Sequence, residues 1–134
     1  MSVSAEKNSG DHAPALKKWG PLAEQGAAPA QYNLAMLYYN GEGVPKNYEI
    51  AFKWFKLAAQ QGLSRAQYSL ALMYLQGNDT MKDYTLAHMW LNIVVSQGFE
   101  EAKEDRDKVE KLMTPEQLES ARKLFREWIE EHGE

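Results

Sequence analysis

The sequence contains no cysteine, and this absence excludes both a disulfide scaffold and a metal site built on thiolates. It also has no basic excess, because its 15 Lys and Arg are outnumbered by 19 Asp and Glu. The resulting net charge of −4 argues against binding to a phosphate backbone, so we expect no nucleic-acid partner. The acidic bias lies at the end of the chain: residues 1–98 carry 8 basic against 7 acidic side chains, whereas residues 99–134 carry 7 against 12.

No apolar run approaches the roughly 18–20 residues that a membrane-spanning helix needs, so we expect no insertion into a membrane. The stretch 1–10 is small and polar and lacks the apolar core of a secretory signal. We expect it to be a disordered tail. The chain as given is therefore expected in the cytoplasm, or in the periplasm or outside the cell if a signal peptide has been removed.

Side chains that could carry out chemistry are few and scattered. His12, His88 and His132 have no second histidine or carboxylate at the spacing of a metal site, and we expect them to be solvated or half-buried. The Ser-x-x-Lys matches that begin at Ser4 and Ser120 lack an accompanying Lys-Thr-Gly motif, so chance explains both. No nucleophile is paired with a base. We therefore predict no catalytic residue, no cofactor and no metal, and a protein that is not an enzyme.

What the chain does contain is a repeat of 36 residues. The dipeptide Gln-Gly recurs at Gln25, Gln61 and Gln97, and the stretch 30–35 (AQYNLA) returns as 66–71 (AQYSLA). Self-similarity at a fixed period of this length is typical of stacked helical repeats. Such arrays usually present binding surfaces.

Within each repeat the pattern predicts two helices and a short loop. Apolar residues at three- and four-residue spacings predict helices over about 29–40 and 48–60 in the first full repeat. The glycine- and proline-rich stretch 41–45 ends the first helix, and Asn47 is the expected N-cap of the second. The next repeat copies this pattern, with Asp83 at the N-cap position.

The last unit departs from the repeat. Arg106 stands where the repeats have Leu34 and Leu70. Thr114 is followed at once by proline and three positions later by glutamine, which is a strong signal for the start of a helix. We expect the helix over about 115–131 to cap the end of a solenoid with one apolar face. That face comprises Leu118, Ala121, Leu124, Phe125, Trp128 and Ile129.

The predicted fold class is all-α: an α/α superhelical solenoid of stacked antiparallel helix hairpins with a C-terminal capping helix. A helix that starts near residue 11 supplies a half repeat, and Gly20-Pro21 is expected to kink or interrupt it. The expected organisation is a tail 1–10, a half repeat 11–27, repeats 28–63 and 64–99, and a divergent capping unit 100–134.

The repeated segments resemble the Sel-one-like repeat family, the longer-period relative of the tetratricopeptide repeat. The resemblance rests on the helix Ala-Gln-Tyr-x-Leu-Ala-x-x-Tyr, the loop Asn-Gly-Glu-Gly-Val-Pro-Lys-Asn-Tyr and the helix Ala-Phe-Lys-Trp-Phe-Lys-Leu-Ala-Ala-Gln-Gln-Gly. It implies hairpins stacked in a right-handed superhelix, with the first helix of each hairpin on the concave side. It also implies an adaptor that holds partner proteins, often in bacterial envelope or signalling assemblies. The cysteine-rich relatives described as weak penicillin-binding enzymes match poorly, because this chain has no cysteine.

Aromatic residues in repeat register could be a stacking platform for bases or sugars, but their regular spacing indicates packing. Trp54 matches Trp90, and Tyr38 matches Tyr74, each pair one repeat apart. We therefore interpret all four as packing residues.

The first helices also carry a second face that packing within a hairpin does not require. This face mixes amide, aromatic and flexible apolar side chains, which suits a groove for a peptide. The alternative is that the same residues pack against the next repeat. The candidate partner-binding residues are Tyr32, Asn33, Met36, Tyr39, Asn40, Tyr68, Ser69, Leu72 and Gln76.

Three functions are compatible with these observations. The first is a non-enzymatic adaptor that binds a peptide or protein segment, of unknown identity, on the concave face. The second is a structural component that self-associates through charges on the closing helix. The third and least favoured is weak penicillin binding, which rests only on the resemblance. The charges invoked for self-association are Arg122, Lys123, Arg126, Glu127, Glu130 and Glu131.

Overall fold

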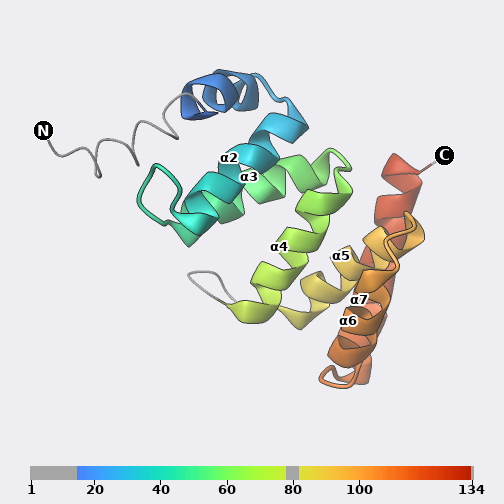
Figure 1. The fold of residues 1–134 in the computed structure, drawn as a ribbon. Coiled ribbons are helices and arrows are strands. Elements are labelled where there is room, and N and C mark those ends of the chain that lie inside the picture. The colour runs from blue at the N-terminus through green and yellow to red at the C-terminus, as the bar shows by residue number, and fades with distance from the viewer. Residues whose placement is uncertain (1–14, 78–81, 134) are drawn as a thin grey trace, which may run out of the picture. The chain divides into compact units, whose positions relative to one another are not determined.

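The computed structural model describes residues 15–77 and 82–133, and every regular element within these ranges is an α-helix (Figure 1). This confirms the predicted all-α fold of helical repeats. The chain divides into two compact units, Met1–Leu63 and Ser64–Glu134. The expected tail over residues 1–10 lies outside the described residues.

The first unit contains a helix at residues 15–24, α2 (Ala28–Asn40) and α3 (Tyr48–Gln60). The two labelled helices pack against each other as a hairpin. α2 ends where Gly41 adopts the left-handed conformation, with a φ of 70°, which glycine accommodates at little steric cost. Asn47 caps α3 as predicted, because its side chain accepts a hydrogen bond from the backbone N–H of Ile50 at 2.9 Å.

Of the expected kink or interruption at Gly20-Pro21, the interruption is wrong, because the helix at residues 15–24 runs through both residues. A proline removes its own N–H from the helical hydrogen-bond ladder and its ring crowds the carbonyl four residues earlier, but its own carbonyl can still accept a hydrogen bond. The carbonyl of Pro21 still accepts a hydrogen bond from the backbone N–H of Gln25 at 3.0 Å, which closes the following turn. The helix therefore ends after residue 24 rather than at the proline.

An apolar cluster joins the helices of the first unit. Its buried members are Ala23, Ala30, Leu34 and Leu37. Trp54 and Tyr38 are partly buried against this cluster, and in the second unit their register partners are buried. The interpretation of these aromatic residues as packing residues is confirmed.

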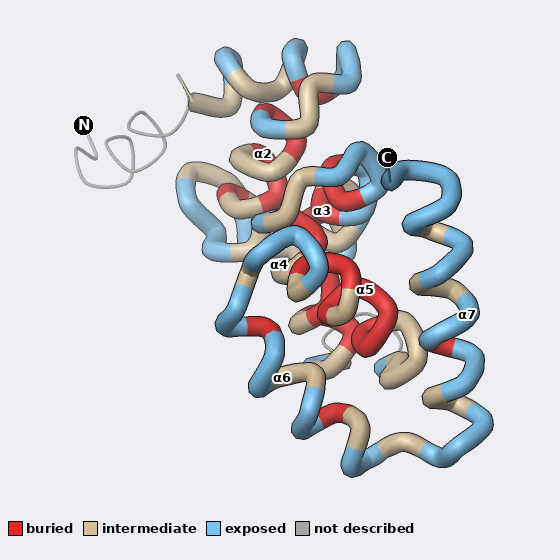
Figure 2. Tube along the Cα trace, turned by 90° about the vertical axis from the view of Figure 1, so that its right-hand side faces the viewer, coloured by how far each residue is buried: buried red, intermediate tan, exposed pale blue. Residues whose placement is uncertain are grey.

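The second unit contains α4 (Ser64–Gln76), α5 (Tyr84–Ser96), α6 (Glu101–Glu110) and α7 (Pro115–His132). α5 is the central helix, since it packs against α4, α6 and α7. Figure 2 shows buried residues concentrated along it. A helix that is covered on several sides must be apolar on several sides, which explains why this segment is the most apolar of the chain. Asp83 caps α5 as predicted by accepting a hydrogen bond from the N–H of Leu86 at 2.9 Å.

α7 begins with the predicted capping box. The backbone N–H of Gln117 donates to Thr114 Oγ1 at 3.1 Å, and the backbone N–H of Thr114 donates to Gln117 Oε1 at 2.9 Å. Ala121 is buried, and the ring of Trp128 lies 5.0 Å from that of Trp90. Ile129, which was predicted to lie on the apolar face, is exposed.

Side-chain amides account for part of the repeat signature. Gln61, from a Gln-Gly dipeptide, donates to Gln31 Oε1 at 2.9 Å, and the amide of Gln31 donates in turn to the carbonyl of Ala23 at 3.1 Å. In the second unit, the hydroxyl of Ser64 donates to the side chain of Gln97. A buried amide is costly unless it is hydrogen-bonded, so the two contacts of Gln31 explain how its amide is tolerated at a buried position.

Candidate functional site

The tyrosines among the candidate residues of α2 are engaged within their own hairpin. The ring centroids of Tyr32 and Tyr39 lie 5.7 and 6.2 Å from that of Phe55 on α3. Tyr39 also lies 5.0 Å from Tyr48 at the start of α3. Aromatic pairs at such separations stabilise a fold beyond the area they bury, so these rings hold α2 to α3.

The other candidate residues of α2 stay accessible. Asn33 and Met36 are half-buried and Asn40 is exposed. They follow one another at spacings of three and four residues, which places them on one face of the helix. A flexible thioether between two amides can adapt to an apolar side chain while the amides hydrogen-bond to a peptide backbone.

On α4, Tyr68 is held by two contacts within the second unit. Its ring lies 4.9 Å from that of Phe99, and its hydroxyl donates a hydrogen bond to Asp105 Oδ2 at 2.5 Å. The hydrogen bond to Asp105, together with partial burial, raises the pKa of Tyr68 to about 12, because ionisation would place a second negative charge beside the carboxylate. This tyrosine therefore ties α4 to α6.

The remaining candidates of α4 repeat the arrangement found on α2. Ser69 and Leu72 are half-buried and Gln76 is exposed, again at spacings of three and four residues. Each unit thus presents one such face, with an apolar side chain between polar ones. The structure brings the three residues of each face together but turns the neighbouring tyrosines inward.

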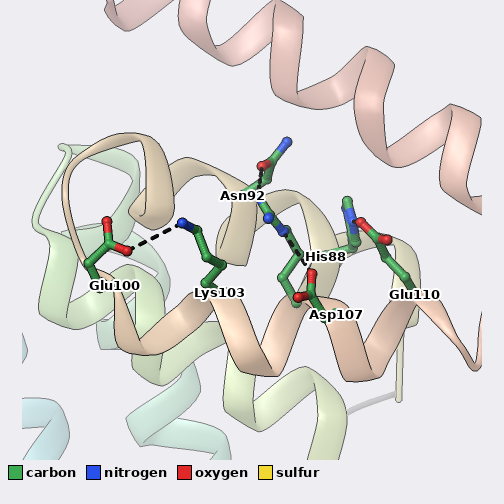
Figure 3. A network of polar contacts seen from close by, with 7 residues as sticks. His88, Asn92, Glu100, Lys103, Asp107 and Glu110 are labelled. Atoms are coloured by element: carbon green, nitrogen blue, oxygen red, sulfur yellow. Dashed lines mark hydrogen bonds and ion pairs between the residues drawn. The ribbon is translucent and has the colours of Figure 1, made fainter.

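His88 on α5 and Glu110 on α6 form a pair that the sequence did not predict. His88 is 1% exposed, and its Nε2 lies 2.8 Å from Oε2 of Glu110, the last residue of α6 (Figure 3). The expectation that this histidine would be solvated or half-buried is therefore wrong. The sequence did offer one signal, because a histidine within the most apolar stretch of the chain indicates a buried side chain that needs a polar partner. The partner itself could not be identified, because it lies 22 residues further along.

Arg106, the residue that breaks the repeat register, also faces α5. Its guanidinium donates to Asn92 Oδ1 at 3.0 Å and lies 3.6 Å from a carboxylate oxygen of Asp107 (Figure 3). The amide of Asn92 supplies a polar acceptor on an otherwise apolar helix. This contact explains how a charge is tolerated where the repeats carry leucine.

Among the described residues, the structure does not bring the other candidates of the sequence together into one site. His132 stacks on Trp128 with ring centroids 3.5 Å apart, while His12 and Ser4 lie outside the described residues. Ser120 is exposed on α7. The charges considered for self-association are exposed as well: Arg122, Lys123, Arg126, Glu127, Glu130 and Glu131.

Neither a metal-binding cluster nor a membrane-spanning helix is found in the described ranges, 15–77 and 82–133. No cluster of three or more His, Asp or Glu in these ranges could hold a metal ion. No helix within them combines the length and the apolar character needed to cross a membrane.

Comparisons with known proteins place the repeat in a family. The model of the Sel1 repeat matches residues 28–63 and 64–99. A solved structure of a protective antigen from uropathogenic Escherichia coli, described as having an SLR fold, aligns with a TM-score of 0.85 and 32% identity over 91% of this chain and 26% of that one. A Sel1 repeat protein from Oxalobacter formigenes aligns with a TM-score of 0.66 and 33% identity over 68% of this chain and 26% of that one.

The chain therefore corresponds to 26% of the length of either of these structures. A search of curated proteins found no match. The two matched repeats cover more than half of the chain, and they are the repeats whose hairpins and caps are described above. This chain belongs to the Sel1 repeat family, the family of Sel-one-like repeats.

Proposed function

We propose that this chain is a non-enzymatic interaction module that holds a peptide or protein segment on its first-helix faces. These faces are Asn33, Met36 and Asn40 on α2, and Ser69, Leu72 and Gln76 on α4. Sel1 repeats in general mediate protein–protein interactions, and their fold is typically a non-catalytic scaffold. The observation that carries the proposal is that Met36 and its register partner Leu72 both remain half-exposed.

The composition of these faces supports binding to protein. Exposed helix positions usually carry charged side chains, yet neither face includes one. Depletion of charge together with methionine and amide groups is typical of the buried centre of a protein interface. The adjoining tyrosines, fixed by their contacts with the second helix or with α6, give each face a rigid border. The first-helix faces therefore suit an extended or helical peptide segment better than they suit bulk water.

The test is affinity capture from a lysate of the source organism with wild type, Met36→Arg, Leu72→Arg and the double variant. Leu112→Arg is the matched control, because Leu112 is 60% exposed and lies on neither face. Thermal melting followed by circular dichroism first establishes that every variant is folded. We expect the double variant to lose partners that wild type and the control retain, since a buried unpaired arginine disfavours the complex.

Two results would contradict the proposal. If the double variant captures the same partners as wild type, the binding surface lies elsewhere. If Met36→Arg and Leu72→Arg both unfold, these side chains belong to the core and the faces are not available to a partner.

A further inference from the structure

A separate hollow lies along α3 in the first unit, and no residue of the first-helix faces lines it. It has a volume of about 680 Å³, and its lining comes from α3. Ile50 and Leu57 supply apolar lining, and Lys53 and Lys56 stand beside them. Leu57 is 37% exposed, on a helix whose opposite face is buried. We call this surface the α3 face.

The second repeat shows what happens when the equivalent surface is covered. One repeat further on, Ile50, Lys53 and Leu57 correspond to Leu86, Met89 and Ile93 of α5. Both α3 and α5 pack against the first helix of their own hairpin, and within the second unit α5 also packs against α6 and α7. Met89 is buried and Ile93 is 0% exposed. At this position of the repeat, the first unit therefore has an exposed leucine, Leu57, and the second unit has a buried isoleucine, Ile93.

Within this chain, α7 is an example of a helix that packs on the apolar surface of another helix. It is amphipathic: Ala121 is buried, Trp128 lies against Trp90, and the opposite side is charged. An amphipathic helix that lays its apolar face into a hydrophobic groove is a recurring mode of recognition. α5 already uses this mode within the chain.

The α3 face differs from its counterpart on α5 in charge. Lys53 replaces Met89 and Lys56 replaces Asn92, which adds two exposed cations beside the apolar lining. The acidic residue that lines the hollow is Glu49. Complementary charges at the rim of an interface select the partner and accelerate its association. The local positive charge therefore favours an occupant with acidic side chains flanking its apolar stripe.

We propose that the α3 face docks an acidic amphipathic helix of a partner protein. This surface involves none of the residues of the first-helix faces, so the inference goes beyond the proposed function. It commits to a helix with an apolar stripe and a net negative charge. The α7 segment, with five glutamates against three Arg and Lys, has both properties.

The probe is a fluorescein-labelled synthetic peptide of residues 115–132, capped at both ends, titrated with the full chain and followed by fluorescence anisotropy. A peptide of the same composition in scrambled order is the control for non-specific attraction. We expect salt-sensitive binding in the micromolar to millimolar range, about −8 to −4 kcal/mol, for the ordered peptide alone. We expect Lys53→Glu/Lys56→Glu to weaken it about tenfold, and Leu57→Asp to weaken it by a similar factor.

Two control variants locate the binding site. Lys17→Glu/Lys111→Glu makes the same change in net charge at exposed positions outside α3 and should leave the affinity unchanged. Met36→Arg should also leave it unchanged, which separates this inference from the proposed function. Circular dichroism confirms that each variant is folded before titration.

Three results would overturn the inference. The first is that the ordered peptide fails to bind or binds no better than the scrambled one. The second is unchanged affinity in both Lys53→Glu/Lys56→Glu and Leu57→Asp, which would place the peptide on α5 in exchange for α7. The third is a dimer in sedimentation experiments without peptide that Leu57→Asp dissociates, because the occupant would then be a second copy of the chain.

Discussion

Removal of the carboxylate of Glu110 tests how the buried His88 is stabilised. The imidazole is 1% exposed, and its Nε2 has the carboxylate as partner at 2.8 Å. In Glu110→Ala that nitrogen loses its partner without gaining access to solvent, and an unsatisfied buried polar group costs about 1–3 kcal/mol. Glu110 is also the last residue of α6, where the helix dipole disfavours a negative charge by about 0.3–1 kcal/mol. Subtracting the midpoint of this relief from the midpoint of the cost, we expect a net loss of about 1.4 kcal/mol.

Removal of the histidine instead should cost less. Its position in the first repeat is occupied by Phe52, so the hairpin geometry accommodates an aromatic hydrocarbon at this place in the register. In His88→Phe the carboxylate of Glu110, which is 32% exposed, can be hydrated rather than stranded. We therefore expect His88→Phe to cost less than about 1 kcal/mol and to be the milder of the two variants. Glu110→Gln, which keeps a hydrogen-bonding group, serves as the matched control and should behave nearly as wild type.

Urea denaturation of the full chain, followed by far-ultraviolet circular dichroism at neutral pH, measures the free energy of unfolding for all four proteins. The expected order of stability is wild type, Glu110→Gln, His88→Phe and then Glu110→Ala. The reasoning is refuted if Glu110→Ala is as stable as wild type, or if His88→Phe is the less stable of the two. The second outcome would show that the attraction between His88 and Glu110 contributes more to stability than the cost of leaving the imidazole without a hydrogen-bond partner.

Two further predictions concern the core and α4. Leu70→Ala should lower the free energy of unfolding by about 2–5 kcal/mol, because it truncates a fully buried side chain. Leu112→Ala, at an exposed position, should change it by less than about 0.5 kcal/mol. Equal losses for the two variants in the same urea assay would contradict the packing of Leu70. Tyr68→Phe tests the hydrogen bond to Asp105: because folding raises the pKa of Tyr68 to about 12, the bond's contribution is fully present below about pH 10 and is lost as the pH rises towards 12. Wild type should therefore lose stability more steeply than Tyr68→Phe across that window, and parallel pH profiles of the unfolding midpoint would show that the hydrogen bond contributes nothing.

The helices and their ends could be predicted because their signals are local. Asn47 and Asp83 cap helices through hydrogen bonds to residues three positions away, and the Thr114 capping box spans the same distance. Such bonds depend only on backbone geometry near the cap. The interruption considered at Gly20-Pro21 did not occur, because the loss of one N–H does not end this helix.

The candidate site was predicted less completely, and Tyr32, Tyr39 and Tyr68 show why. Each tyrosine lies at the border between the packed and open faces of its helix, so periodicity alone leaves the direction of its ring undecided. The rings turn inward because Phe55, Tyr48 and the segment that follows α5 offer aromatic or carboxylate partners. Whether the remaining residues of the first-helix faces bind a partner stays a prediction.

The sequence by itself determined the period, the hairpins, the caps and the family, because each of these depends on residues that are close along the chain or that recur at a fixed interval. Tertiary structure alone decided which polar groups are buried. Gln31 receives its hydrogen bond from a residue 30 positions away, and His88 meets its carboxylate 22 positions away. Burial removes the water that would otherwise satisfy such groups, so each must find a partner wherever the fold places one. That choice depends on how helices pack, which no local pattern records.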